Sequence, residues 1–505
     1  MKAFTIKNAA TVAVAALSVA AAVTAAHATA DPNANYQTKR TFDYINTVGK
    51  MGLTLSMQHC GSPWNLDDLQ SNPPNEKKSE ITRTYEITGR YPAIIGLDWL
   101  NSQAFSFRNT ATINLAKDWT NRGGIVQFQF HEGTPRGYNP EDTSFYVNGA
   151  GGSNQAALSS GEWNDLLNNN SSSMHQNWQH HMDLAAGWMQ QLQSAGVVIL
   201  WRPYHEGHGN WFWWGGNATN YKALWKMQFN YLTNTKGLHN LLWVTSASDP
   251  NYYPGDAYVD ITGFDEYTNN QYDGAFTSTA NSVRSNSSSK TLALTETGLL
   301  PANSVIQQNK YAWVAIWDGG FLDPAYYGSP GNPGGNTNAQ VQSFYWDPHT
   351  ICLSPGVWNG QYKMIARNSG LALDAYGLGT ADGTQLGQYA YGGGANQKWA
   401  VCYIGNGQYI FGNQNAAKPL DVIGSGGAGT FTELYSLNTA NNQRWVLTYT
   451  DSNNYRVSPA YNTALALDVY GAATGNYNPA SGNNGRIDVY SWFGTTNQQW
   501  SFQFP

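Results

Sequence analysis

The segment Trp201–Gly215 holds the residues of this chain that are best suited to chemistry on a sugar. Its sequence, WRPYHEGHGNWFWWG, places one carboxylate, Glu206, after the apolar run Val197–Trp201, with two histidines around it and three tryptophans following. A carboxylic acid can protonate a glycosidic oxygen, and flat indole rings stack on the C–H faces of pyranose rings. The segment therefore indicates acid catalysis on a carbohydrate.

Cleavage of a glycoside usually requires a second carboxylate on the other side of the scissile bond. Glu296 is the best candidate, because it follows the apolar run Leu292–Thr295 and stands just before a glycine turn. Glu132 and Glu266 are alternatives. Glu132 is expected on a loop rim, and strand alternation would turn Glu266 away from the residues on either side of it.

Two other interpretations of Glu206 are weaker. It could be a structural acid paired with Arg202, although its aromatic surroundings argue against this. His205 and His208 lack the one-turn spacing of a metalloprotease helix, and the glycines at 207 and 209 disfavour a helix. We therefore expect neither a metal nor another cofactor.

Eight short apolar runs alternate with possible helices between residues 40 and 320. The runs are Gly52–Gln58, Ala93–Trp99, Gly124–Phe130, Gly196–Trp201, Leu241–Thr245, Ile261–Phe264, Leu292–Thr295 and Ala312–Trp317. Helical candidates include His175–Ser194 and Tyr221–Asn234. Eight strands with crossovers predict a (β/α)8 TIM barrel, with a doubly wound open sheet as the alternative.

Polar or aromatic residues follow most of these runs. They are His59, Asp98, His131 with Glu132, His205 with Glu206, Asp265 with Tyr267, Glu296 and Trp317. In a barrel, the carboxyl ends of the strands meet on one face, where catalytic groups gather. We therefore expect most of these side chains to surround one site, and two or three of them to be ordinary loop residues.

The character of the chain changes after the loop-forming segment Asn332–Asn338. Beyond Gly356 there is no helical pattern, and an apolar stretch that ends in aspartate recurs at Asp374, Asp421 and Asp468, at intervals of 47 residues. A Gln-x-Trp motif follows each copy, ending at Trp399, Trp445 and Trp500. Three such copies predict three equivalent units around one core.

The composition favours an uncharged partner. Charged residues make up 12% of the 505 residues, against roughly 25% in typical globular proteins, and aromatic residues make up 14%. The net charge of −6 is spread along the chain without a basic stripe. Nucleic acid is therefore not an expected partner.

The N-terminal residues resemble a secretory signal. Lys2 and Lys7 precede the apolar run Ala9–Ala26, and Ala28–Ala30 fits a small-residue cleavage site. A membrane anchor is the alternative, but the run is short and only weakly hydrophobic. We expect cleavage after Ala30 and a secreted, extracellular, monomeric protein without a membrane segment.

Three cysteines occur, Cys60, Cys352 and Cys402. An odd number allows at most one intrachain disulfide, and the sequence does not determine which pair, if any, forms. Their spacing matches no zinc motif.

The first part of the chain resembles glycoside hydrolase family 26, the β-mannanases, over residues 40 to 345. Besides Trp201–Gly215, the stretches that carry the resemblance are Pro92–Trp99, Asn240–Val244, Tyr253–Asp260, Gly263–Tyr267 and Leu294–Gly298. The resemblance implies a (β/α)8 barrel, a retaining mechanism and cleavage of internal β-1,4 bonds in plant-type β-mannan. The family often has Met-Asn where this chain has Gly207–His208, a departure expected to affect the leaving-group side.

The resemblance also implies roles for individual residues. Glu206 would be the acid/base and Glu296 the nucleophile. His205 would bind substrate or hold Glu206, and Trp211 would stack beside the scissile bond. Two further implied substrate-binding residues are Tyr267, which would hold Glu296, and Asp265, which would lie near Tyr267. His131 and Trp317 would line the subsite of the reacting sugar, with Trp313 as an alternative to Trp317. Trp213 and Trp214 could be either core residues or sugar contacts.

The C-terminal repeat resembles the ricin-type β-trefoil of carbohydrate-binding module family 13. The resemblance implies that the Gln-x-Trp tryptophans pack the core and that each repeat carries one sugar site. The three sets are Asp374, Tyr389 and Asn396; Asp421, Tyr435 and Asn442; and Asp468, Tyr490 and Asn497. An insertion at Gly471–Arg486 makes the third set the least regular, and we expect at least one site to be silent.

These observations predict an α/β (β/α)8 TIM barrel followed by an all-β trefoil. The predicted segments are a signal peptide (1–30), a hydrolase barrel (31–345), a linker (346–355) and a trefoil (356–505). The leading hypothesis is a secreted endo-β-1,4-mannanase. The alternatives are a β-1,3-xylanase or mixed-linkage β-glucanase of the same family, and a polysaccharide-binding protein without catalysis.

Overall fold

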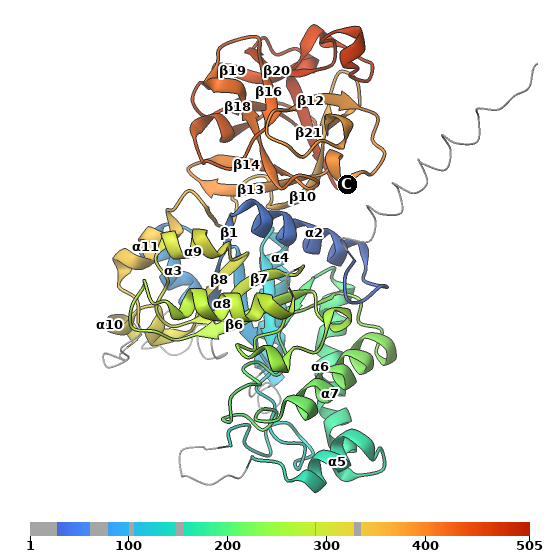
Figure 1. Cartoon of the computed structure of the whole chain (residues 1–505), viewed down its shortest axis with the longest axis vertical. Helices are drawn as coiled ribbons and strands as arrows, with labels where there is room; N and C mark the ends of the chain where they lie inside the picture. Colours follow the sequence, from blue (N-terminus) through green and yellow to red (C-terminus); the bar gives the residue numbers. More distant parts are fainter. Residues whose placement is uncertain (1–27, 61–78, 100–105, 148–155, 288, 328–334) are drawn as a thin grey trace, which may run out of the picture.

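Two folded units follow one another along the chain, a barrel and then an all-β domain (Figure 1). The computed structural model describes residues 28–60, 79–99, 106–147, 156–287, 289–327 and 335–505. Apart from residues 28–30, the expected signal peptide lies outside these ranges. Within them, no helix combines the length and the apolar character needed to cross a bilayer.

The first unit is a ring of parallel strands, as the eight apolar runs predict. The strands are β1 (Thr54–His59), β2 (Ile94–Asp98), β3 (Ile125–Gln129), β4 (Ile199–Trp201), β5 (Leu241–Trp243), β6 (Ile261–Glu266), β7 (Thr291–Thr297) and β8 (Trp313–Ile316). They are ordered β5-β4-β3-β2-β1-β8-β7-β6, and a parallel bridge from Val244 to Ile261 joins the two ends. The TIM barrel is therefore confirmed over the open sheet.

Helices surround this ring. They are α2 (Tyr36–Met51), α3 (Glu80–Thr88), α4 (Ser106–Asn121), α5 (Ser160–Asn168), α6 (Ser173–Ser194), α7 (Ala218–Phe229), α8 (Ala275–Asn286), α9 (Asn303–Asn309), α10 (Pro324–Tyr327) and α11 (Asn338–Tyr345), with shorter turns η4 (Pro250–Tyr252), η5 (Asp256–Tyr258) and η6 (Gly319–Phe321). The predicted helix at 175–194 is α6, which the side chain of Ser172 caps. The predicted helix at 221–234 is α7, continued by a π-helical turn, η3 (Asn230–Thr235).

The second unit is a trefoil of twelve strands in three similar copies. The strands are β10 (Gly360–Ala366), β11 (Ala372–Ala375), β12 (Thr384–Tyr389), β13 (Trp399–Gly405), β14 (Gln408–Asn413), β15 (Lys418–Val422), β16 (Thr430–Leu434), β17 (Trp445–Tyr449), β18 (Asn454–Pro459), β19 (Leu465–Val469), β20 (Ile487–Ser491) and β21 (Gln499–Gln503). Trp399, Trp445 and Trp500 are fully buried, as predicted. Their indole N–H groups donate to equivalent carbonyls in the three copies, those of Leu373, Leu420 and Leu467.

The segment expected as a linker, residues 346–355, is part of the folded structure. It contains β9 (Thr350–Ile351), which pairs with β1 of the barrel. The apolar side chain of Ile351 is fully buried, so pairing removes it from water. Cys60, Cys352 and Cys402 are all buried, and no disulfide joins any two of them.

The trefoil packs against the end of the barrel opposite the carboxyl ends of its strands. Helix α2 lies between the two units and contacts β10, β13 and β14 (Figure 1). Apolar residues of α2, such as Ile45 and Val48, belong to one buried cluster with Cys402 and Ile410 of the trefoil. The two units therefore share a hydrophobic core, and the mouth of the barrel faces away from the trefoil.

Candidate active site

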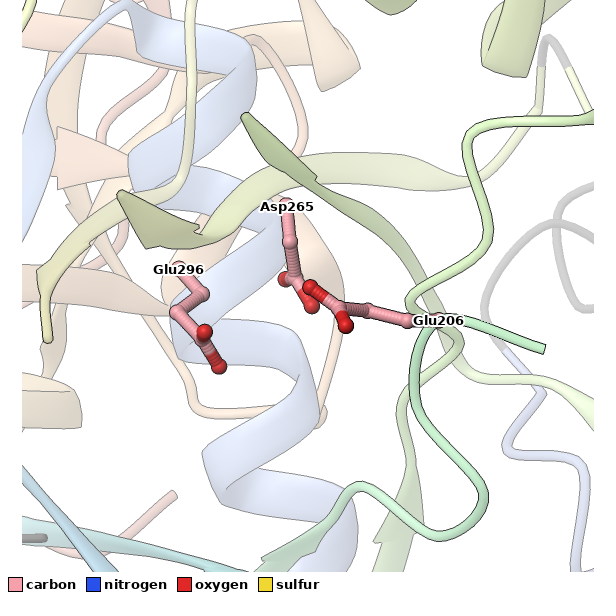
Figure 2. A group of neighbouring side chains, drawn as sticks. All are labelled: Glu206, Asp265 and Glu296. Atoms are coloured by element: carbon pink, nitrogen blue, oxygen red, sulfur yellow. The ribbon is translucent and has the colours of Figure 1, made fainter. Parts of the chain in front are cut away.

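Three carboxylates meet at the mouth of the barrel. Glu206 lies in the loop after β4, whereas Asp265 and Glu296 lie in β6 and β7. One oxygen of each lies within 4.8 Å of one oxygen of both others, and Figure 2 shows the three groups converging from separate segments. Inverting glycosidases need carboxyl groups about 6.5–9.5 Å apart, and retaining ones about 5–5.5 Å. The closest oxygens of Glu206 and Glu296 are therefore nearer to each other than the wide separation that inverting enzymes need.

A bulge in the sheet sets the position of Glu296. The register of β6 and β7 shifts between Phe264 and Asp265, so that Asp265 stands opposite Glu296 and Thr295 is extra. Adjacent residues of a regular strand face opposite ways, and a bulge relaxes that rule. As a result Thr295, whose hydroxyl donates to Asp265 over 2.7 Å, and Glu296 both reach into the site.

Arg202 neutralises this cluster from below. Its guanidinium is fully buried, pairs with Asp265 and donates to Oε2 of Glu296 over 3.0 Å. It also donates to Gln129 and to the Ser246 hydroxyl. Arg202 already supplies positive charge to two of the three carboxylates. The negative charge of the cluster is therefore largely balanced by the protein, whereas a metal site would offer carboxylates that are not already paired. Among the described residues Arg202 forms its salt bridges with Asp265 and Glu296, and none with Glu206, as the structural alternative for that acid would require.

The backbone at Glu206 adopts a conformation that side-chain-bearing residues rarely take. Tyr204 and Glu206 have φ angles of 46° and 53°. Such left-handed residues cost about 1–3 kcal/mol each and persist only where their surroundings enforce them. Here the Glu206 N–H donates to the carbonyl of Ser246 over 2.7 Å, and the Gly209 N–H donates to the carbonyl of Glu206 over 2.9 Å. Backbone bonds thus hold the loop that presents this acid.

The two glutamates differ in what stabilises their charge. Burial and the charges of Asp265 and Glu296 raise the pKa of Glu206 well above its usual range. Burial and Asp265 also raise the pKa of Glu296, but Arg202 and the Tyr267 hydroxyl, which donates over 2.5 Å, oppose that rise. Among the described residues, the donor to the Glu206 carboxylate is the neutral indole of Trp211, at 2.7 Å. Glu206 is therefore the partner that holds a proton, and Glu296 is the partner stabilised as an anion.

Aromatic rings line the space around these groups. Trp211 is 41% exposed, which leaves its indole face free to stack on a sugar. His131 is buried and binds Asp98 through Nδ1 at 2.6 Å. The ring of His205 packs edge-on against His131, with 4.6 Å between centroids, and Trp317 lies 6.4 Å from His131. The predicted substrate-binding residues thus surround one site.

Other residues proposed from the sequence lie away from the carboxylates. Glu266 accepts from Thr279 of α8 over 2.7 Å, so it faces away as strand alternation predicts. Trp213, Trp214 and Trp313 are at most 1% exposed and are core residues, which favours Trp317 over Trp313 as a sugar contact.

The expectation of Glu132 on a loop rim is wrong. Its side chain is 1% exposed and binds Nδ1 of His181 on α6 over 2.8 Å. His181 satisfies one oxygen of this carboxyl group, and burial still raises the pKa of Glu132.

Sequence reasoning missed the polar layer beneath the site. Gln129 accepts from Arg202 and donates to Asp98 over 2.9 Å, which links β2, β3 and the carboxylate cluster. The signal that could have found this layer is a polar residue at the end of a buried strand, as Gln129 is in β3, because a buried polar group requires a partner.

The predicted trefoil residues also come together in each repeat. The Nδ2 of the asparagine donates to the aspartate over 2.9 Å in the first set (Asn396, Asp374), 2.9 Å in the second (Asn442, Asp421) and 2.7 Å in the third (Asn497, Asp468). The three tyrosines, Tyr389, Tyr435 and Tyr490, are 42–45% exposed. Burial raises the pKa of Asp374 and of Asp421 to about 6. Each repeat therefore presents a carboxylate beside an open aromatic ring.

Comparison with known proteins agrees with both units. The model of glycosyl hydrolase family 26 matches residues 30–352, and that of ricin-type β-trefoil lectin-like domains matches residues 342–435 and 405–481. A mannan endo-1,4-β-mannosidase of Thermothelomyces thermophilus is 31% identical over 258 residues, which are 48% of this chain and 51% of that protein. The chain spans about half the length of the curated relatives that it matches.

Solved structures resemble the barrel. The structure of GH26A from a Muricauda species is 27% identical, with a TM-score of 0.53, and the match covers 64% of this chain and 98% of that one. A GH26-CBM35 β-(1,4)-mannanase from Podospora anserina is 25% identical, with a TM-score of 0.52, over 65% and 68% of the two chains.

Proposed function

The chain belongs to glycosyl hydrolase family 26, and on that premise we propose that it is an endo-β-1,4-mannanase that retains anomeric configuration. Its substrates would be the internal β-1,4-mannosidic bonds of mannan, galactomannan or glucomannan. The observation that carries the proposal is the approach of Glu206 to within 4.8 Å of Glu296, whose anion Arg202 and Tyr267 stabilise. The names of similar proteins support mannan as the substrate.

The proposed reaction has two displacements. In the first, the Glu296 carboxylate attacks the anomeric carbon and forms an ester, while Glu206 gives its proton to the departing glycosidic oxygen. In the second, Glu206, now ionised, takes a proton from water, the water oxygen attacks the same carbon, and Glu296 leaves as a carboxylate. Once the ester forms, Glu296 is uncharged, which lowers the pKa of Glu206 and suits it to act as a base.

The trefoil and the N-terminal segment fit the same function. The three Asp–Tyr–Asn sets of the trefoil would hold the enzyme on polysaccharide. The proposed signal peptide would export the chain to where such polysaccharides occur.

Hydrolysis by point variants tests the assignment. We expect Glu296→Ala to abolish release of reducing sugar from galactomannan, because Asp265, the other carboxylate of the cluster, is held by Arg202 and by the Thr295 hydroxyl. We expect Glu206→Ala to lower kcat by about 10²–10⁴-fold, the usual contribution of a positioned acid. Glu266→Ala is the matched control, because that carboxylate faces α8, and it should keep near-wild-type activity.

The same assay identifies the substrate. Wild-type enzyme should act on galactomannan in preference to β-1,3-xylan and mixed-linkage β-glucan, and proton NMR should show the β-anomer as the first product. Preference for either of the other polymers would replace mannan in the proposal. Near-wild-type turnover by Glu296→Ala with an unchanged circular dichroism spectrum would overturn the catalytic assignment.

A further inference from the structure

The third trefoil repeat carries extra residues that pack onto the first repeat. The Asp-to-Asn distance along the chain is 22 residues in the first repeat and 21 in the second, but 29 in the third. The extra length lies in residues 471–486, here called the insertion loop. Part of this loop lies beside β12 of the first repeat, where Gly387 forms a bridge with Arg486.

Several hydrogen bonds hold the insertion loop in this place. The Tyr477 N–H donates to the carbonyl of Gln388 over 2.8 Å, and the Gln388 N–H donates to Gly485 over 2.9 Å. The Gln388 side chain donates to the carbonyl of Gly475 over 2.8 Å. The Tyr477 hydroxyl donates to Gln385 over 2.6 Å. The loop is therefore a fixed part of the first repeat's surface.

One glycine makes this packing possible. Gly387 stands directly across the strand pair from Asp374, and a Cβ atom there would lie 2.4 Å from the ring of Tyr477. The positions across from the other two aspartates carry side chains, Glu433 and Asp488. The trefoil backbone thus accepts a side chain at this position. Only the first repeat has a glycine there, and the ring of Tyr477 fills the space that a side chain would occupy.

The insertion loop and the first sugar set line one open pocket of about 820 Å³. Asp374, Tyr389 and Asn396 line part of it, and Tyr376, Asn476 and Asn478 line another part. Tyr376 is 39% exposed and meets Tyr477 edge-on at 5.4 Å. This volume lies in the upper part of the range of about 300–1,000 Å³ that is typical of pockets for drug-sized ligands, which are larger than one sugar ring.

Asn476 is suited to bind a hydroxyl group. Its Oδ1 accepts from the Ala390 N–H over 2.9 Å, which fixes the side chain. Within the part of the chain that the structure describes, its Nδ2 donates to no other group. The pocket therefore offers a second aromatic ring and a second amide next to the Asp374 set.

We propose that the insertion loop adds a second sugar subsite to the first repeat, so that this repeat binds two consecutive units of a neutral polysaccharide. The inference rests on the proposed role of the trefoil in holding polysaccharide. Asp374, Tyr389 and Asn396 bind one ring, and Asn476 and Tyr376 bind the next. The first repeat then differs from the other two in preferring a chain over a single sugar.

Calorimetric titration of the full chain tests this subsite. The background carries Glu296→Ala to prevent hydrolysis, and Asp421→Asn with Asp468→Asn to silence the other two repeats. The probes are mannose with mannobiose, xylose with xylobiose, and galactose with lactose. Adding Asp374→Asn gives the binding by the barrel alone, which is subtracted.

We expect at least one disaccharide to bind the background protein about tenfold more tightly than its monosaccharide. Asn476→Ala should reduce this ratio to about twofold, because one hydrogen bond contributes roughly a five- to tenfold change in affinity. Gly387→Ala should do the same by displacing Tyr477. Asn483→Ala is the matched control, since this exposed asparagine of the same loop does not line the pocket, and it should keep the ratio.

The outcomes separate the inference from the proposed function. Loss of binding in Asp374→Asn with an unchanged ratio in both Asn476→Ala and Gly387→Ala would overturn the second subsite and leave the trefoil as a sugar-binding domain. Absence of any binding above the Asp374→Asn baseline would overturn both.

Discussion

Arg202 and Glu206 are close in the chain, and together they limit the net negative charge of the site. Arg202 does so as a cation, and Glu206 does so by keeping its proton. Arg202 contacts Asp265 and Glu296, and Glu206 lies just beyond this pairing. Three close carboxylates with one guanidinium cannot all remain ionised at low cost. The proton therefore resides on the acid that Arg202 does not contact, which is also the acid proposed to protonate the leaving group.

This charge balance predicts a pH-dependent effect of Glu206→Gln on stability. The folded-state pKa of Glu206 lies above the unfolded value of about 4.3, so its contribution to stability is fully present below pH 4.3 and is lost as pH rises through the folded pKa. Glutamine keeps the hydrogen bond from Trp211 and cannot ionise. We expect the variant to have a free energy of unfolding roughly 1–2 kcal/mol higher than wild type at pH 8, and equal to it near pH 4.

Urea titrations from pH 4 to pH 8 measure this difference, and Glu162→Gln provides a control of opposite sign. The Arg136 pair lowers the pKa of Glu162 to about 2, so this glutamate contributes stability above pH 4.3 that is lost in acid. That variant should be less stable than wild type at pH 8. Equal or lower stability of Glu206→Gln at pH 8 would contradict the protonation assigned to it.

The loop after β4 packs so closely against its neighbours that its glycines cannot be replaced by larger residues without displacing other atoms. The loop after β4 passes Gly207 across the ring of Tyr221, where a Cβ atom would lie 2.1 Å from a ring carbon. A Cβ atom added at Gly209 would lie 2.4 Å from the indole of Trp211. The glycine at 207, where the family often has another residue, is therefore needed in this chain by the way that α7 packs under the loop.

Gly207→Ala tests how this packing positions the acid. The added methyl group must displace the loop or Tyr221, so we expect kcat to fall at least tenfold, since a shift of about 1 Å can cost about 10²-fold. Gly187→Ala on α6 is the control, because its Cβ would meet no atom within 4 Å. It should keep full activity and gain roughly 0.5–1 kcal/mol of stability. Steady-state kinetics on galactomannan with an unfolding curve decide the result, and full activity of Gly207→Ala would contradict the account.

At the scale of the whole molecule, the barrel and the trefoil behave as one folded body. Arg90, between α3 and β2, is buried and donates to the carbonyl of Tyr345 over 2.7 Å and to that of Ile404 in the trefoil over 3.2 Å. Its guanidinium also stacks on Trp346, 3.6 Å from the ring centre. Domains joined by a hydrophobic interface move little relative to each other. The trefoil would therefore hold polysaccharide at a fixed distance from the catalytic mouth.

Arg90→Ala should weaken this coupling. Wild-type protein should unfold in one calorimetric transition, and the variant should show the trefoil and the barrel unfolding separately. Its loss of stability should be about 2–4 kcal/mol, since buried carbonyls lose their donor. Arg122→Ala, which removes an exposed helical ion pair, should leave the single transition unchanged. Two transitions in wild type would refute the shared core.

The sequence by itself determined how often strands and repeats recur along the chain, and it indicated the candidate acids. Eight buried runs, three repeats and the residues at the strand ends follow from local patterns of burial, and local patterns are visible in a linear sequence. Tertiary structure alone decided which groups stand beside the acids. The bulge that brings Thr295 and Glu296 into one site, the buried histidine partner of Glu132, and the pairing of β9 with the barrel depend on residues far apart in the chain.

The same holds for Trp201–Gly215. Its glutamate is evident from the sequence, but its proton depends on Asp265, Glu296 and Arg202, which only folding places together, because electrostatic energy depends on distance in space.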